Sequence, residues 1–437
     1  MIFRWKAASA TTLQPITMLS MSSALLSYGD AAALVAARAR ELAGHRWPAE
    51  CAPLGLAAGR VLADSLLADC DLPPFPRSTR DGFACRATDA ATRAFLPVAG
   101  TLRAGDPPAG PLQPGSVWEI MTGAPVPDGA DAVLMLENVE SADGKIRVTG
   151  SRSIDSGENI VPRGTEARAG DELVRAGTRL ASPQIAVAAA CGYTSLPVFS
   201  KPRVAILATG DELVPVESTP GPGHIRNSNG PMLAAMVAAA GGRSLLLPRA
   251  ADDPDALDSA IERAASSDLL VITGGVSAGR FDLVEEALAR AGARFHFTGV
   301  RIQPGKPAVF GEMPRGSGAG ARTQPFFGLP GNPISSAATF LLFVAPVLAA
   351  LAGTEEPTPR FALAKLGRNC KGKDGLTRFV PACCDFHPDI GQPATVEAVT
   401  WHGSGDLAAF AQSNCFLVVP EGVELLRAGE TATILIP

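Results

Sequence analysis

Apolar and polar residues alternate in blocks along residues 201–353. Continuous apolar runs of strand length, at 203–209 and 269–273, are each followed by a glycine. Such runs predict strands that are buried on both faces, as in a parallel sheet. Further strands are expected at 245–247 and 308–311, and helices at 231–240, 253–265 and 282–291. This alternation predicts a doubly wound α/β domain, in which ligands bind at the carboxyl ends of the strands.

The pattern differs on either side of this domain. Residues 24–45 are rich in alanine and predict a helix that Ser27 or Asp30 caps. Residues 86–155 contain short β-like runs between glycine and proline turns, which predicts a small β-rich domain. After residue 353 the β-like pattern returns and predicts a small C-terminal β-barrel. Its strands are expected at 376–384, 395–400, 416–419 and 432–436.

The composition limits the class of protein. The chain has 437 residues, of which 46% are hydrophobic and 19% charged, and a formal net charge of -5. These values predict a globular protein without an electrostatic preference for nucleic acid or for an anionic membrane. The longest apolar run, 339–351, is shorter than the ~18 residues of a membrane span and predicts a buried helix. The eight cysteines form no C-x-x-C pair, which predicts reduced, mostly buried thiols in a cytoplasmic protein.

The N-terminal segment allows two interpretations. The first 29 residues contain no Asp or Glu and carry Arg4 and Lys6, as targeting segments do. The interpretation that we prefer is a disordered extension, or a start codon placed upstream of Met18 or Met21.

The segment Thr273-Gly-Gly-Val-Ser-Ala-Gly-Arg-Phe-Asp282 connects a predicted buried strand to a predicted helix. Gly274 and Gly275 let backbone N–H groups approach an anion, and Ser277 adds a hydroxyl donor. Asp282 is placed to hold a Mg²⁺ that bridges phosphate oxygens. The alternative is a tight turn in which Asp282 only caps the helix. A second glycine-rich segment, at 316–321, is expected to be a surface insertion, because no predicted strand leads into it.

Four further turns of this domain carry polar residues. Asp211 and Glu212 follow the first strand, where they are suited to bind a metal, a ribose or a pterin, or merely to cap a helix. Asp252 and Asp253 precede a proline at a helix start, which is also an ordinary capping arrangement. Lys306 lies in a Pro-Gly-Lys-Pro turn and is a natural counter-charge for a small oxyanion. The fourth turn, Leu329-Pro-Gly-Asn-Pro, leads into a predicted helix that begins near Ser335 and Ser336. The hydroxyls of these serines and the N–H groups at the helix start suit the same anion.

Taken together and in order, these segments resemble the molybdopterin molybdenumtransferase family, which includes MoeA and the E domain of gephyrin. The resemblance covers about residues 24–437. Its segments are Pro73-Pro-Phe-Pro-Arg-Ser-Thr-Arg-Asp81-Gly-Phe-Ala, Ile120-Met-Thr-Gly-Ala-Pro-Val-Pro-Asp-Gly-Ala-Asp-Ala-Val, Thr209-Gly-Asp-Glu-Leu, Ile225-Arg-Asn-Ser-Asn-Gly-Pro-Met-Leu, Thr273-Gly-Gly-Val-Ser-Ala-Gly-Arg-Phe-Asp-Leu-Val, Pro304-Gly-Lys-Pro and Gly328-Leu-Pro-Gly-Asn-Pro.

The resemblance implies a homodimer of multidomain subunits. The expected parts are a disordered extension at 1–23, a discontinuous linker domain at 24–76 and 156–200, a small β-rich domain at 77–155, a molybdopterin-binding α/β domain at 201–353, and a β-barrel at 354–437. It also implies that the active site lies between the α/β domain of one subunit and the N-terminal half of its partner. Asp81 and Thr122 would then belong to that site.

The resemblance also implies the reaction. Adenylylated molybdopterin and molybdate are the substrates, AMP is released, and Mg²⁺ assists. The implied catalytic residues are Asp81, Thr122, Glu212, Asp282 and Lys306. The implied ligand-binding residues are Gly274, Gly275, Ser277, Pro304, Gly305, Lys306, Asn332, Ser335, Arg378 and Ser404. The implied metal-binding residues are Asp252, Asp253 and Asp282. The expected protein partners are a molybdopterin adenylyltransferase and apo-molybdoenzymes.

The chain departs from the family pattern around the expected oxyanion pocket. Many members carry basic residues where this chain has Gly299 and Gln303, although Arg301 lies between them. Leu376 stands where an arginine is common, with Arg378 two residues on. These departures leave the preference between molybdate and tungstate open. The alternatives in function are a molybdopterin adenylyltransferase and a non-catalytic pterin-binding scaffold.

Overall fold

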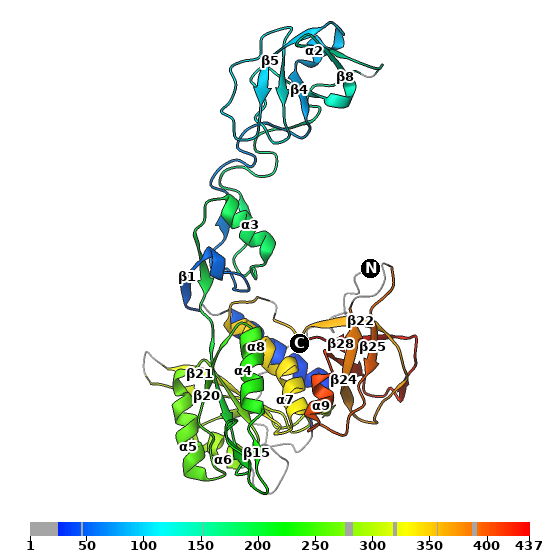
Figure 1. Cartoon of the computed structure of the whole chain (residues 1–437). Coiled ribbons are helices and arrows are strands. Elements are labelled where there is room, and N and C mark those ends of the chain that lie inside the picture. The colour runs from blue at the N-terminus through cyan, green and yellow to red at the C-terminus, as the bar shows by residue number, and fades with distance from the viewer. Residues whose placement is uncertain are drawn as a thin grey trace, which may run out of the picture. The chain divides into compact units, whose positions relative to one another are not determined.

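The computed structural model describes residues 25–44, 47–151, 153–275, 283–317, 321–355, 357–386 and 391–437. The chain divides into two units. Unit 1 consists of Met1–Arg46 and Lys201–Pro437, and unit 2 of Trp47–Ser200. The α/β region and the C-terminal β region therefore belong to one unit (Figure 1).

A six-stranded sheet forms the centre of the α/β region, in the order β16-β13-β17-β21-β20-β18. The strands are β13 (Arg203–Ala208), β16 (Arg243–Leu246), β17 (Leu269–Thr273), β18 (Arg294–Phe297), β20 (Val309–Arg315) and β21 (Arg322–Leu329). The first four in spatial order are parallel, and β20 runs antiparallel to both of its neighbours. The predicted parallel arrangement is confirmed for β16, β13 and β17. The strand expected at 308–311 is part of β20 and is antiparallel to its neighbours, and β18, β21 and the length of β20 were not predicted.

The glycine-rich segment at 316–321 directly follows a strand, contrary to the expectation from the sequence. Strand β20 leads directly into it, and Arg315 at the end of β20 pairs with Arg322 at the start of β21. The segment is thus the connection of a β-hairpin, and the premise that no strand leads into it was wrong.

Helices cover both faces of this sheet (Figure 1). Helices α5 (Pro254–Arg263) and α6 (Leu283–Arg290) pack against each other on one face, where Leu257, Val284 and Phe326 are buried in a common core. Helices α4 (Asn229–Ala239), α7 (Pro333–Thr339) and α8 (Ala345–Leu351) lie on the other face. Helix α1 (Tyr28–Ala43) packs on α8. Ser27 caps α1 by accepting a hydrogen bond from the N–H of Asp30, as predicted.

A single apolar helix runs from Pro333 to Leu351. It joins α7, a π-helical segment at Phe340–Val344 and α8. With 19 residues and a mean hydropathy of 2.2, it is long and apolar enough to cross a membrane, and 89% of it is buried inside the protein. The predicted buried helix at 339–351 is shorter than the observed one, because the first turn after Pro333 contains the polar residues Ser335 and Ser336. Extensive burial is typical of a core helix.

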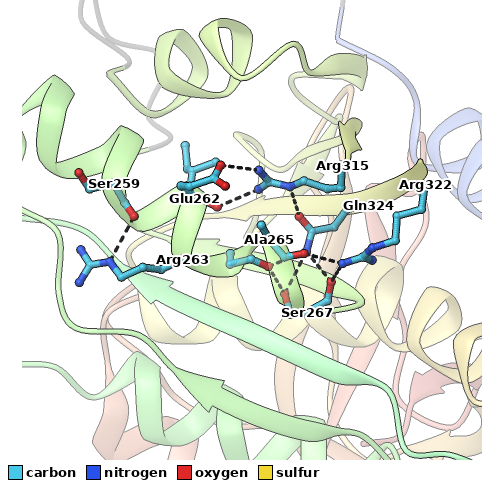
Figure 2. Close-up of polar contacts among 10 residues, drawn as sticks. Ser259, Glu262, Arg263, Ala265, Ser267, Arg315, Arg322 and Gln324 are labelled. Carbon is cyan, nitrogen blue, oxygen red and sulfur yellow. Dashed lines mark hydrogen bonds and ion pairs between the residues drawn. The ribbon is translucent and has the colours of Figure 1, made fainter. Parts of the chain in front are cut away.

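A cluster of buried polar side chains joins the β20–β21 hairpin to the end of α5 (Figure 2). We call Arg315, Gln324 and Ser267 the hairpin cluster. The Arg315 Nε donates to Gln324 Oε1 at 2.8 Å, and its Nη2 donates to the Ile261 carbonyl at 2.8 Å. The Gln324 Nε2 donates to the carbonyls of Ala264 and Ser267, at 2.9 Å and 2.7 Å. These bonds satisfy carbonyls that the end of a helix leaves free.

The C-terminal region is a closed barrel of five strands, because β24 pairs with both β25 and β26. The strands are β22 (Phe361–Leu366), β24 (Thr377–Asp385), β25 (Thr395–Ala398), β26 (Cys415–Val419) and β28 (Thr431–Leu435). Strand β19 (Ile302–Gln303) adds to β24 from the α/β region. Smaller elements are β23 (Cys370–Lys371), β27 (Leu425–Leu426) and α9 (Leu407–Ala411). The predicted barrel is confirmed. All eight cysteines are free, and Cys383 and Cys384 of β24 are exposed and buried, as their alternation predicts.

Unit 2 contains a second six-stranded sheet, in the order β7-β4-β6-β5-β9-β8. Its strands are β4 (Gly82–Cys85), β5 (Leu96–Leu102), β6 (Val117–Ile120), β7 (Ala132–Met135), β8 (Val139–Ala142) and β9 (Lys145–Val148). Three strand pairs complete the unit: β1 (Ala49–Pro53) with β12 (Ser195–Phe199), β2 (Leu66–Leu67) with β11 (Glu172–Val174), and β3 (Arg77–Ser78) with β10 (Ile160–Val161). Its helices are α2 (Ala87–Ala91) and α3 (Ser182–Ala190).

Candidate functional site

The carboxyl ends of β13, β17 and β21 lie together and bring three turns into contact. The Thr209 N–H donates to the Thr273 carbonyl at 3.0 Å, and the Gly274 N–H donates to the Leu329 carbonyl at 3.2 Å. Gly274 has a φ of 89°, and a Cβ there would lie 2.4 Å from the Thr209 carbonyl oxygen. Only glycine fits this position. The close approach at the start of the loop is thus to the backbone of Thr209, and the predicted contact with an anion stays a prediction.

The rest of that loop lies outside the described residues. Ser277 and Asp282 are among the omitted positions, so their predicted roles stay predictions. Gly275 is described, and a Cβ on it would meet Val284 of α6 at 2.7 Å. The loop thus leaves β17 through two positions at which no side chain is tolerated.

Beneath these turns lies a buried polar group, which we call the carboxyl-end cluster: Thr209, Asn229, Thr273 and Ser336. The Asn229 Nδ2 donates to Thr273 Oγ1 at 2.8 Å and to the Gly331 carbonyl at 2.7 Å. Thr273 Oγ1 lies 3.1 Å from Ser336 Oγ, and both hydroxyls lie within hydrogen-bond distance of the Pro330 carbonyl. The Ser336 hydroxyl, expected to face an anion, is used inside the protein instead.

Two atoms of the carboxyl-end cluster differ from the rest. Thr209 Oγ1 and Asn229 Oδ1 are buried and have no hydrogen-bond partner among the described residues. In the sequence, Asn229 belongs to the family segment that begins at Ile225, and no role is predicted for it. Its contacts join turns that are far apart in sequence, and no local pattern carries that information.

An acidic group occupies the neighbouring strand ends. Asp211 Oδ1 lies 3.4 Å from Arg249 Nη1 and 3.4 Å from the Asp252 N–H. Burial raises the pKa of Asp252, and the charges of Asp211 and Glu212 raise it further. Across the described ranges, no group of three or more His, Cys, Asp or Glu residues is arranged to hold a metal ion.

The predicted metal-binding residue Asp253 has another task in this structure. Its Oδ1 accepts hydrogen bonds from the N–H groups of Asp255 and Ala256, at 3.1 Å and 3.0 Å, and so caps α5. The capping alternative is confirmed for Asp253. Asp252, by contrast, has a pKa that is raised by burial and by the charges of its acidic neighbours.

The Pro-Gly-Lys-Pro turn packs against α7. Pro304 and Gly305 are buried, whereas Lys306 is exposed. Gly305 has a φ of 112°, and a Cβ on it would lie 2.5 Å from Thr339 Cγ2 of α7. The turn therefore presents the Lys306 ammonium group to solvent from a rigid backbone.

Ser404 of the C-terminal region lies at the start of α7. The Asn332 Nδ2 donates to Ser404 Oγ at 2.9 Å, and the Ile334 N–H donates to the Ser404 carbonyl at 3.1 Å. Ser335 follows in α7 and is only 4% exposed. Two predicted binding residues, Asn332 and Ser404, are thus brought together although 72 positions separate them.

Two arginines lie on the neighbouring edge of the barrel. Gln303 of β19 pairs with Arg378 of β24, and the Arg301 carbonyl accepts from the Thr377 N–H at 3.1 Å. The Nε atoms of Arg301 and Arg378 are buried without a hydrogen-bond partner among the described residues. Arg301 Nη2 lies 3.6 Å from a carboxylate oxygen of Glu421, so part of its charge is balanced.

Asp81 and Thr122 form a pair in unit 2. Gly82 pairs with Ile120 across β4 and β6, which places Asp81 beside Thr122. Asp81 Oδ1 accepts from the Thr122 N–H at 2.7 Å and from its hydroxyl at 2.8 Å. These two hydrogen bonds, the backbone one first, lower the pKa of Asp81. The pair is exposed and its carboxylate is held ionised.

Comparison with known protein families decides the classification. Three family models match successive parts of the chain: the MoeA N-terminal region (domain I and II) at residues 26–192, a probable molybdopterin binding domain at 205–350, and the MoeA C-terminal region (domain IV) at 363–436. The chain belongs to the molybdopterin molybdenumtransferase family.

Individual relatives align with most of this chain. The molybdopterin molybdenumtransferase of Bacillus subtilis is 34% identical over 385 residues, which span 86% of this chain and 87% of the relative. The one from Nostoc is 33% identical and covers 88% of both chains. The crystal structure of the molybdopterin biosynthesis MoeA protein from Pyrococcus horikoshii superposes with a TM-score of 0.78 at 29% identity. It covers 95% of this chain and 100% of its own. The expected family and fold class are confirmed.

Proposed function

We propose that the protein inserts molybdate into adenylylated molybdopterin and releases AMP, so completing the molybdenum cofactor. The observation that carries this proposal is the meeting of two glycine turns at the carboxyl ends of β17 and β21. A Cβ on Gly331 would lie 3.6 Å from the Gly274 Cα. The chain around these turns aligns over most of its length with relatives named for this reaction.

The residues of the chain suit an anionic substrate. The backbone N–H group of Gly275 can approach an anion closely, because Gly274 and Gly275 lie where no side chain is tolerated. Such groups bind phosphate oxygens without bringing a side-chain charge. Lys306 adds a positive charge close to α7 and is the counter-ion for molybdate in this proposal. Arg378 and Ser404 bind on the barrel side.

A divalent cation such as Mg²⁺ fits the acidic group by its donor chemistry. Hard cations take carboxylate oxygens. Burial raises the pKa of Asp252 most, and the charges of Asp211 and Glu212 add a repulsion that a cation would relieve. Glu212 and Asp252 would hold the ion, together with Asp282. When bound, the ion neutralises charge on the phosphate oxygens as the anhydride breaks.

Further parts of the proposal concern assembly. We place Asp81 and Thr122 among the catalytic residues, since a carboxylate held ionised can orient a water molecule or a metal ligand. We propose a cytoplasmic homodimer that receives its substrate from a molybdopterin adenylyltransferase and delivers to apo-molybdoenzymes. The domain boundaries at residues 24, 77, 156, 201 and 354 are part of the same proposal.

The two alternative functions are not favoured. A molybdopterin adenylyltransferase resembles the α/β region only, whereas the family matches continue through residues 26–192 and 363–436. A non-catalytic scaffold would not need to retain an exposed Lys306 on a rigid turn.

One assay distinguishes the three functions. The purified protein is incubated with adenylylated molybdopterin, Mg²⁺ and molybdate, and AMP release is followed together with the activation of an apo-molybdoenzyme. The proposal predicts both signals. Adenylylation of free molybdopterin by ATP would support the first alternative, and pterin binding without AMP release the second. A parallel reaction with tungstate measures the oxyanion preference.

A further inference from the structure

The side chain of Asn229 forms hydrogen bonds with both of the turns that contain Gly274 and Gly331. It lies in the first turn of α4 and is only 8% exposed. Its side-chain nitrogen donates to Thr273, directly before Gly274, and to the carbonyl of Gly331, directly before Asn332. A single amide group thus spans residues that are 44 and 102 positions away in sequence.

The orientation of this amide follows from its partners. The Gly331 carbonyl can only accept a hydrogen bond, so the nitrogen of Asn229 must face it. The opposite orientation would place two oxygen atoms 2.7 Å apart. Asn229 Oδ1 is therefore the buried atom that has no hydrogen-bond partner among the described residues.

An unpaired buried acceptor is unfavourable for folding. Thr209 Oγ1 is a second atom of the same cluster with no partner in the part of the chain that the structure describes, and a Cβ on Gly275 would lie only 2.8 Å from it. Both atoms lie at the strand ends where the turns begin. Polar groups retained in this way at a ligand site point to a role in function and not in stability.

We propose that Asn229 is a positioning residue that holds the turns at Gly274 and Gly331 together, so that their backbone N–H groups bind one anionic ligand. This inference rests on the proposed function, because the ligand in question is adenylylated molybdopterin. Asn229 acts through Thr273 and Gly331 and does not take part in the chemistry.

The same domain offers a matched control. Gln324 is likewise a buried amide whose nitrogen donates to distant segments, here to the carbonyls of Ala264 and Ser267. Gln324 lies near the amino end of β21, and its partner Ser267 precedes β17 (Figure 2). Its removal should affect the fold without affecting ligand binding.

The test compares three variants with the wild type. Asn229→Ala removes both donated hydrogen bonds, Asn229→Asp keeps the volume but turns a donor into an acceptor, and Gln324→Ala is the control. The dissociation constant for adenylylated molybdopterin is measured by equilibrium dialysis without molybdate. KM and kcat come from AMP release, and Tm from thermal unfolding.

We expect both Asn229 variants to raise the dissociation constant and KM by at least about 10-fold, since small misplacements of binding groups are costly. Asn229→Ala and Gln324→Ala should lower Tm by a similar amount, roughly 2–6 °C, but Gln324→Ala should leave the dissociation constant within about twofold. If Asn229→Ala does not fold, the isosteric Asn229→Asp carries the test.

Two results would overturn the inference. One is an Asn229→Asp variant with wild-type dissociation constant and KM. The other is an equal loss of affinity in Gln324→Ala, which would assign the effect to general loosening of the domain. Failure of the wild type itself to bind adenylylated molybdopterin would instead reject the proposed function.

Discussion

Two of the buried polar clusters described in the α/β region lie at opposite ends of one sheet, and they differ in how completely their hydrogen bonds are made. In the hairpin cluster, the polar atoms of Arg315, Gln324 and Ser267 all have partners. In the carboxyl-end cluster, Thr209 Oγ1 and Asn229 Oδ1 have none among the described residues.

This difference separates stability from function. A satisfied buried network fixes the structure, and each of its bonds contributes to the free energy of unfolding. A buried polar atom without a partner lowers that free energy, so its retention needs another reason. Of the two clusters, only the one with unpaired atoms adjoins glycine turns suited to an anion. The predictions below test whether the two clusters behave as differently as this contrast requires.

The largest effect is expected at Lys306, whose turn packs against α7 through Gly305. Lys306→Ala should lower kcat for AMP release by about 100-fold, because one charge is lost where an oxyanion binds. Tm should not change, since the side chain is exposed. The control is Lys201→Ala, an exposed lysine that precedes β13 at the other end of the sheet. Equal losses in both variants would contradict a specific role for Lys306.

Next is Arg315 in the hairpin cluster, which is 8% exposed. Arg315→Met leaves Gln324 Oε1 and the Ile261 carbonyl without their charged donor, and should lower the free energy of unfolding by about 3 kcal/mol. Urea denaturation measures this change. KM at low temperature should stay at the wild-type value. A raised KM in a folded Arg315→Met protein would remove the distinction between the clusters.

A smaller effect, of opposite sign, is expected for Thr209. Thr209→Val replaces the unpaired hydroxyl by a methyl group and should raise the free energy of unfolding by about 1 kcal/mol. The affinity for adenylylated molybdopterin should fall. Ser267→Ala, which removes a bonded hydroxyl of the hairpin cluster, should instead lower the free energy by about 1 kcal/mol. Destabilisation by Thr209→Val would show that its hydroxyl supports the fold.

The smallest effect concerns the exposed pair in unit 2. The pKa of Asp81 is lowered from 3.8 by Thr122, so the ionised carboxylate favours the folded state. That contribution is present above the unfolded pKa and is lost as the pH falls through the folded pKa. Thr122→Val removes the hydroxyl bond but keeps the backbone bond, and should raise the pKa part of the way back. NMR titration of the Asp81 carboxyl group measures it, and an unchanged pKa would contradict the assignment.

Much of the fold follows from local sequence. Both ends of strand β17 agree with the prediction, because Asp268 and Gly274 lie directly before and after an uninterrupted apolar run. The β20–β21 hairpin was not predicted, since an antiparallel pair inside an α/β domain depends on pairing over the whole sheet. The same holds for the length of the helix from Pro333 to Leu351, whose polar first turn is buried only by tertiary contacts.

The candidate site divides in the same way. Glycine positions were predictable where a close backbone approach leaves no room for a side chain, as at Gly274. The roles of Asn229 and Ser336 were not, because their hydrogen bonds join distant segments. For Asp253, the sequence admitted both a metal ligand and a helix cap, and only the observed bonds to Asp255 and Ala256 distinguish them.

The central claim is that the glycine turns of this chain serve molybdenum insertion, and its most direct test is stoichiometry. The wild-type protein is incubated with adenylylated molybdopterin, Mg²⁺ and molybdate. AMP is measured by chromatography, and molybdenum in the isolated pterin by mass spectrometry. The account predicts equal molar amounts of AMP and pterin-bound molybdenum. AMP release without molybdenum in the pterin, or no AMP release at all, would contradict it.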